Sequence, residues 1–229
     1  MEQPLVMRMI GTNYSAEKEE EINLWHMLEH VPLVLRGPAT GNERFQRVGE
    51  DDAHPKYLAT YDFESEKALN DYLGSPLFAE ARNQVPQAWR EQGHFTSVWS
   101  VNYRLIAKRG DHDRSLAFSM IGTNCPRGAD EAQFNDWYNN DHMVFVLRNP
   151  NVIRAERYQR IGEDPKYPKY LAIYRYENEK TLAEGRDTWV DKLAIPDRRK
   201  RYPDDVWDRR WFVRYKLISK QRKDLVVYG

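Results

Sequence analysis

Histidine leads the residues of this chain that could do chemistry. His30 and His142 each follow a tryptophan at the same spacing, in residues 25–30 (WHMLEH) and 137–142 (WYNNDH). The unperturbed pKa of histidine lies near neutrality, so a positioned imidazole can act as a general acid or base. We therefore expect His30 and His142 to be catalytic. The alternative is that both only form hydrogen bonds within the fold.

His26 is a third catalytic candidate, because it lies one helical turn before His30 and shares its helix face. Such a pair can also bind a metal ion, with His94 or Glu29 as a third ligand. Tyr138 stands at the position of His26 in the second motif, and no HExxH pattern accompanies the pair. We therefore expect no metal site.

Aromatic residues form a second group of candidates. The chain has 7 Trp and 14 Tyr, and large rings with polar tips suit planar apolar ligands as well as interfaces. Residues an even number apart on a strand share one of its faces. We expect the following side chains either to bind substrate or to fill the core: Trp25, Trp137, Tyr61, Tyr174, Trp99, Tyr103, Trp211 and Tyr215.

Arginine and the remaining histidines complete the candidates. Arg36 and Arg148 could bind an acidic substrate group through paired hydrogen bonds, or complement the dipole at a helix C-terminus. His94 is expected in a pocket wall, and His54 and His112 at the surface. Surface or sheet-edge positions are also expected for the hairpin arginines Arg44, Arg47, Arg157 and Arg160.

These motifs recur because the chain contains an internal repeat. Residues 9–13 (MIGTN) return as 120–124, residues 44–50 (RFQRVGE) as 157–163 (RYQRIGE), and residues 55–61 (PKYLATY) as 168–174 (PKYLAIY). Ahead of the tryptophans, the same comparison pairs Glu21 with Glu131. A repeat of roughly 110 residues has the size of a small domain. The sequence predicts two domains, residues 1–107 and 116–229, joined by a polar linker.

The element order predicted within each half is βαββαβ. In the first half, a strand at 5–10 precedes a helix at 16–35, which Pro32 should kink or end. Alternation at 45–48 and 57–63 predicts a hairpin. A second helix follows at 66–73 (179–193 in the second half), then an irregular proline-bearing stretch and a last strand. This order is that of a ferredoxin-like domain. We expect an α+β fold of two tandem domains packed sheet to sheet.

Composition excludes several function classes. The 35 Lys and Arg residues balance 35 Asp and Glu, so no net charge favours nucleic acid or an anionic membrane. The single cysteine, Cys125, excludes an internal disulfide. No signal-peptide pattern, membrane-length apolar run or nucleotide-binding glycine motif occurs. We expect a soluble cytoplasmic protein with a small-molecule substrate, no nucleic acid or membrane partner, and scope for homo-oligomers.

The element order, the Trp-x4-His spacing and the Arg-[Phe/Tyr]-Gln-Arg strand resemble the dimeric α+β barrel superfamily, and within it the EthD-like group. The likeness covers both halves, so the chain resembles a barrel built from one polypeptide in place of two. The resemblance implies ligand sites between each sheet and its helices. It also implies a wide choice of activities, which includes cofactor-free monooxygenases, decarboxylases, cyclases, isomerases and haem-dependent enzymes.

We interpret the chain as an enzyme that acts on an aromatic or hydrophobic metabolite by histidine-mediated proton transfer, as a lyase, decarboxylase or isomerase does. One alternative is a haem- or oxygen-dependent oxidative enzyme, and another is a non-catalytic protein that binds aromatic ligands. No cofactor is expected; the alternative is haem or a metal ion at His26 and His30. Because His26, His54 and His94 add to the first half, we predict that its pocket is the active one.

Overall fold

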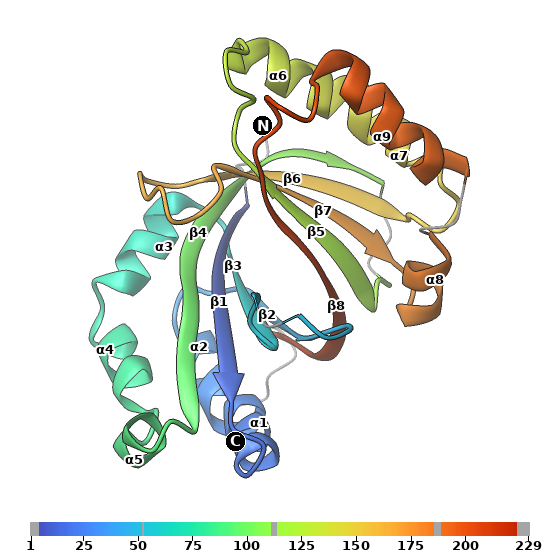
Figure 1. The fold of residues 1–229 in the computed structure, drawn as a ribbon. Coiled ribbons are helices and arrows are strands. Elements are labelled where there is room, and N and C mark those ends of the chain that lie inside the picture. Colours follow the sequence, from blue (N-terminus) through green and yellow to red (C-terminus); the bar gives the residue numbers. More distant parts are fainter. Residues whose placement is uncertain (1–4, 52, 111–113, 186–188, 224–229) are drawn as a thin grey trace. The chain divides into compact units, whose positions relative to one another are not determined.

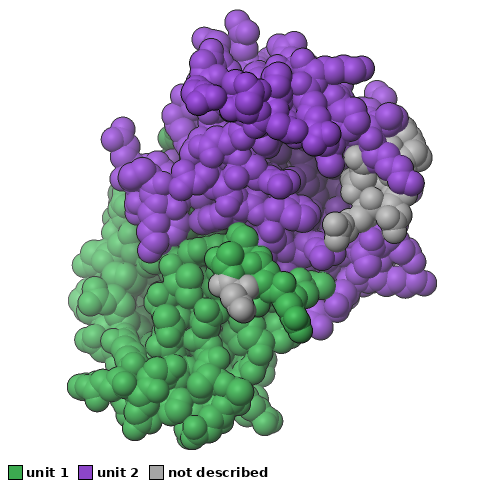
Figure 2. All heavy atoms as spheres, viewed as in Figure 1, with its two compact units in different colours: residues 1–104, 217–229 green, residues 105–216 purple. Residues whose placement is uncertain are grey.

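The chain divides into two compact units. The computed structural model describes residues 5–51, 53–110, 114–185 and 189–223. Unit 1 comprises residues 1–104 and 217–229, and unit 2 comprises residues 105–216 (Figure 2). Two long strands cross this division, because β4 (Phe95–Arg109) runs from unit 1 into unit 2 and β8 (Arg209–Arg222) runs from unit 2 into unit 1.

Each half contributes an antiparallel sheet of the same order. The first is β2-β3-β1-β4 and the second is β6-β7-β5-β8. The register repeats, because Ile10 pairs with Ala59 and Ile121 pairs with Ala172. The remaining strands are β1 (Val6–Tyr14), β2 (Gly41–Arg47), β3 (Tyr57–Phe63), β5 (Ala117–Thr123), β6 (Arg154–Arg160) and β7 (Tyr170–Tyr176).

The eight strands follow the order β1-β3-β2-β8-β5-β7-β6-β4 in a closed antiparallel barrel. This confirms the predicted α+β fold of two tandem ferredoxin-like halves. Thus each half supplies four strands to one hydrogen-bonded structure.

Helices cover one face of the sheet in each unit (Figure 1). Their apolar sides are buried, as at Ile22, Leu69, Phe134 and Leu182. None of the helices in the described residues is long and apolar enough to cross a membrane. The helices are α1 (Glu19–Trp25), α2 (Val31–Leu35), α3 (Glu66–Leu73), α4 (Pro76–Asn83), α5 (Gln87–Glu91), α6 (Glu131–Trp137), α7 (Met143–Val146), α8 (Glu179–Glu184) and α9 (Trp189–Arg201).

A π-helical turn interrupts the first helix of each half, at η1 (His26–His30) and η2 (Tyr138–His142). The turn is present in both halves, although Val144 replaces Pro32 in the second, so proline does not cause it. Pro32 lies in the first turn of α2, where its missing N–H costs little. The helix continues past Pro32 to Leu35, so Pro32 does not end it. Single π turns often mark functional sites, and each of these ends on a motif histidine.

The stretch before the last strand is helical, which corrects the prediction of irregular structure. Ser75 caps α4 by accepting a hydrogen bond from the Phe78 amide, and Pro76 occupies the first turn, a position that suits proline. In the second half, α9 extends through Pro196. Pro76 lies at the start of α4 and Pro196 lies inside α9. Proline therefore does not indicate irregular structure in this part of the chain.

The glycine of the repeated MIGTN segment permits close packing against two side chains. A Cβ atom at Gly11 would lie 2.5 Å from Pro55 Cγ and 3.1 Å from Trp99 Cβ. At Gly122 it would lie 2.6 Å from Pro168 Cγ and 3.0 Å from Trp211 Cβ. The register between β1 and β4 shifts between Gly11 and Thr12. Strand β1 continues beyond this shift and past the predicted strand end, to Tyr14.

Gly11→Ala is expected to lower the free energy of unfolding by about 1–3 kcal/mol, because the added methyl group overpacks the contact with Pro55 and Trp99. Gly74→Ala is the matched control. Gly74 has right-handed backbone angles, and an added Cβ there meets nothing closer than the Asn70 carbonyl oxygen at 3.5 Å. Urea unfolding of both variants measures the difference, and equal losses of stability would contradict this account.

Candidate functional site

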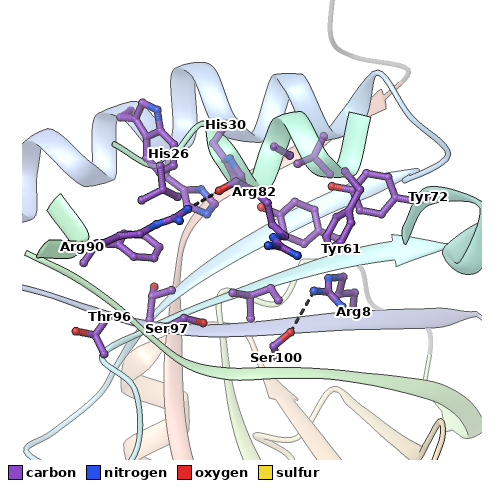
Figure 3. A pocket seen from close by; sticks show the side chains of 18 residues that line it. Arg8, His26, His30, Tyr61, Tyr72, Arg82, Arg90, Thr96, Ser97 and Ser100 are labelled. Atoms are coloured by element: carbon purple, nitrogen blue, oxygen red, sulfur yellow. Dashed lines mark hydrogen bonds between the residues drawn. The ribbon is translucent and has the colours of Figure 1, made fainter. Parts of the chain in front are cut away.

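A cavity of about 630 Å³ lies in unit 1 between the sheet and its helices (Figure 3). Four predicted site residues line it, namely Trp25, His26, His30 and Tyr61. The sheet also contributes Arg8, Ile10 and Thr12 from β1 and Ser97 and Ser100 from β4. Helices α3 to α5 contribute Tyr72, Phe78, Ala81, Arg82 and Arg90. The cavity thus occupies the position that the family resemblance implies for a ligand.

His30 is tethered at one ring nitrogen. Its Nδ1 lies 3.1 Å from Gln84 Oε1, and because the amide oxygen accepts, Nδ1 carries the hydrogen and Nε2 keeps a free lone pair. The ring packs at 5.0 Å between centroids against Trp25. Burial lowers the pKa of His30 to about 4, with Arg44 contributing to the decrease against the opposing effect of Gln84. At neutral pH this imidazole is therefore an oriented free base.

His26 lies beside His30, with 4.9 Å between ring centroids. The side chain is buried, and its Nδ1 has no hydrogen-bond partner. Burial first, and then the charges of Arg44 and His30, hold the pKa of His26 well below its usual value. A neutral imidazole carries one N–H, so His26 can offer a single hydrogen bond to a ligand in the cavity.

A polar group lies on another side of the cavity from the histidines and consists of Arg8, Tyr61 and Tyr72 (Figure 3). The Tyr61 hydroxyl is buried and has no hydrogen-bond partner. Burial raises the pKa of Tyr61 above its usual value and that of Tyr72 to about 12. Both phenols are therefore protonated at neutral pH. Tyr61 was predicted from the sequence. Arg8 and Tyr72 were not, because Ser119 and Gly185 stand at their positions in the second half.

The structure does not assemble the third metal ligand considered from the sequence. Glu29 is exposed, and His94 Nδ1 lies 2.8 Å from Ser15 Oγ, outside the lining of the cavity. Within the described parts of the chain, no group of three or more His, Cys, Asp or Glu side chains could hold a metal ion.

The second histidine motif has different neighbours. His142 is buried and stacks on Trp137 with 4.9 Å between ring centroids. Burial, Arg157 and Arg198 lower the pKa of His142 to about 4. Its Nδ1 has no hydrogen-bond partner, whereas His30 has Gln84. At the position of His26 stands Tyr138, whose hydroxyl accepts a hydrogen bond from Tyr174 at 3.5 Å.

The other predicted site residues lie outside the cavity lining. Trp99 packs on His54 and Trp211 on Tyr167, while Tyr103 and Tyr215 are fully buried. Arg36 and Arg148 are exposed near the ends of α2 and α7. Contrary to expectation His54 is half-buried, and it binds Asp51. His112 lies outside the described residues.

The hairpin arginines Arg44 and Arg157 are buried, with 2% and 0% of their surface exposed, so their predicted surface position is wrong. Arg44 donates to the Asn23 carbonyl and side chain at 3.2 and 2.8 Å. Arg157 donates to Asn139 and lies 4.0 Å from the centroid of the Tyr138 ring. The helices cover the strand face that the prediction left open to solvent.

One pairing between the halves is also corrected. Glu131 binds the Tyr170 hydroxyl and Lys169, and the corresponding contacts with Tyr57 and Lys56 are made by Glu19. Glu19, not Glu21, is thus the structural counterpart of Glu131. Glu21 instead pairs with Lys18 on the surface.

Comparison with solved structures places the chain among proteins with the dimeric α+β barrel fold. An anthrone oxidase-like protein superposes with a TM-score of 0.65 at 12% identity and covers 96% of this chain and 94% of its own. A candidate monooxygenase from Fusobacterium nucleatum gives 0.60 at 8% identity, with 97% and 96% covered. A chlorite dismutase from Candidatus Nitrospira defluvii gives 0.60 at 11% identity, with 94% and 92% covered. At these identities the likeness is one of fold.

Sequence comparison finds a short match. The chain is 40% identical over 48 residues to the core atranone cluster protein 1 of Stachybotrys chlorohalonatus. The matched segment spans 21% of this chain and 20% of that relative. No protein-family model matches the chain.

Stability is expected to fall as the pH decreases from 6.5 to 4. In this range the unfolded chain binds protons on His30 and His142 that the folded protein excludes, since both pKa values are about 4 in the folded state. Each histidine should lower the free energy of unfolding by up to about 2 kcal/mol between pH 7 and pH 5.

Urea unfolding at the two pH values measures this effect, and His142→Gln should remove one histidine's share of it. A pH dependence that is identical in the variant and the parent protein would contradict the assignment.

Proposed function

We propose that this protein is an oxidative enzyme that acts on an aromatic carbon acid in the cavity of unit 1. The observation that carries the proposal is His30, a neutral imidazole held at Nδ1 by Gln84 in the wall of a cavity of about 630 Å³. Such a base can remove a proton from carbon that is conjugated with a carbonyl group. The fold likeness to an anthrone oxidase-like protein and to a candidate monooxygenase supports oxidation as the outcome.

The substrate class is an anthrone-type ketone, in which aryl rings flank a CH₂ group. His30 Nε2 takes one proton from this carbon, and the electron pair moves to the carbonyl oxygen. His26 donates a hydrogen bond to the enolate oxygen so formed. The apolar and aromatic part of the wall, with Ile10, Trp25 and Phe78, suits planar rings.

Dioxygen is the oxidant. The enolate passes one electron to O₂, and the resulting superoxide and carbon radical join in a C–O bond. The peroxide takes the proton back from His30 and then loses water as the second C–H proton leaves. In total, CH₂ and O₂ give C=O and H₂O. The proposal retains the proton transfer predicted from the sequence as the first step. It replaces the predicted lyase or isomerase reaction with an oxidation.

Haem-dependent oxidation is the second candidate, and the residues present fit the group. His30 lines the cavity with Nε2 free, and its Nδ1 has the outer partner that a metal-ligating histidine usually has. Bound haem would supply redox-active iron, with His30 as its protein ligand and Arg82 and Arg90 near its carboxylates. Haemin titration distinguishes haem-dependent oxidation from the haem-free reaction. Haem-dependent oxidation requires a Soret shift on binding, and His30→Gln should remove that shift.

We also propose that the chain belongs with the EthD-like group of α+β barrels. The basis is the Trp-x4-His motif, whose histidine lies in the cavity wall in unit 1. The short sequence match is to a protein of an atranone cluster, and it is consistent with a role in metabolism.

Oxygen uptake with anthrone tests the function. The protein should accelerate uptake above the uncatalysed rate, and His30→Gln should lower kcat by about 100-fold or more, the usual contribution of a general base. His142→Gln is the matched control from the other half and should leave kcat within about threefold.

No acceleration by the parent protein would reject the oxidative function with this substrate class. Equal losses from the two variants would instead contradict the assignment to unit 1.

A further inference from the structure

Arg8 places a cation in the cavity of unit 1 without a carboxylate partner among the described residues. Its Nη1 donates to Asn102 Oδ1 at 3.0 Å and its Nη2 to Ser100 Oγ at 3.1 Å. Both acceptors are neutral. The guanidinium also lies 5.5 Å from the centroid of the Phe78 ring. A guanidinium has five N–H groups, so donors remain after these bonds.

The Arg8 guanidinium is poorly solvated. The side chain is half-buried, and burial lowers its pKa from the usual value, although arginine stays charged at any physiological pH. A charge taken out of water costs free energy unless a partner compensates it. The two neutral acceptors compensate only part of that cost.

The charged residues described in the cavity lining are all basic or histidine. None of its described lining residues is Asp or Glu, whereas Arg82 and Arg90 join Arg8 as cations. Arg82 and Arg90 are exposed on α4 and α5, so they can attract an anion from solvent. Arg8 comes from strand β1 of the sheet and is half-buried.

Tyr61 supplies a second unused donor beside Arg8. The two residues are directly opposite each other in the register of β1 and β3, and the buried Tyr61 hydroxyl has no partner. At the equivalent position of unit 2 Tyr174 faces Ser119, and its hydroxyl is already bonded to Tyr138. In unit 2 the arginine lies one strand away, at Arg214 opposite Ser119. Among the described residues, unit 1 thus pairs an unbonded phenol with an arginine directly opposite it, and the equivalent position of unit 2 does not.

We propose that Arg8 and Tyr61 form a binding site for a carboxylate group of the aromatic substrate. The carboxylate accepts from the guanidinium and from the phenol, while the ring system extends toward His26 and His30. Figure 3 shows the two groups on different sides of the cavity. This inference rests on the proposed function and narrows its substrate to aromatic carboxylic acids.

Calorimetric titration with anthracene-2-carboxylate and anthracene-2-carboxamide tests the site. The two probes have nearly the same shape and differ in charge, and neither has a CH₂ group to oxidise. The carboxylate should bind at least about tenfold more tightly than the amide, as expected for charge-assisted hydrogen bonds. Arg8→Gln should remove this preference while leaving amide affinity within about threefold.

Lys67→Gln is the charge-matched control, because Lys67 is exposed on α3 and pairs with Asp71. It should leave both affinities unchanged. Tyr61→Phe should lower the affinity for the carboxylate probe by about threefold or more and leave the affinity for the amide probe unchanged. This variant, together with the comparison of the two probes on the parent protein, keeps the test decisive if Arg8→Gln does not fold.

Equal affinity of the parent protein for both probes would overturn the proposal, as would a preference that survives Arg8→Gln. Because neither probe is oxidised, the result is independent of oxygen chemistry. Absent oxygen uptake together with selective binding would reject the proposed oxidation and keep the carboxylate site.

Discussion

The buried guanidinium of Arg44 is the interaction on which the site of unit 1 depends. It joins strand β2 to helix α1 through the Asn23 carbonyl and side chain. Burial lowers the pKa of both His26 and His30, and the charge of Arg44 lowers it further. One buried cation therefore joins the helix that carries the histidines to the sheet and helps to keep their imidazoles neutral. Arg157 has the corresponding role in unit 2, where it lies among aromatic rings and lowers the pKa of His142.

The two halves show how one backbone supports different chemistry. Both have the π-helical turn that ends on a histidine, and both pack that histidine against a tryptophan. The difference lies in the partners. Gln84 orients His30, whereas Nδ1 of His142 is unpaired. Replacement of Tyr138 by His26 removes a phenol and leaves the Tyr61 hydroxyl free. Small substitutions around a shared frame thus change which polar groups remain available to a ligand.

Much of the fold was predictable because the chain repeats. Segments that match over a whole domain must form the same elements, so the hairpins and strand order followed from alternation and spacing. The helices before the last strand were missed, because proline was taken as a sign of irregular structure where Pro76 begins a helix. Arg44 was predicted at the surface but is buried, because strand alternation does not show which face of the sheet the helices cover.

The sequence by itself determined the repeated unit through comparison of the halves, and the barrel fold through the family resemblance. It also identified His26 and His30, which line the cavity of unit 1. Only the tertiary structure decided their surroundings. Gln84 lies far from His30 along the chain, and Arg8 meets Tyr61 through strand pairing. Burial, which sets the charge of the histidines, results from packing between distant elements. The same packing gives Arg8 two neutral partners and no carboxylate among the described residues. Residue spacing cannot reveal it.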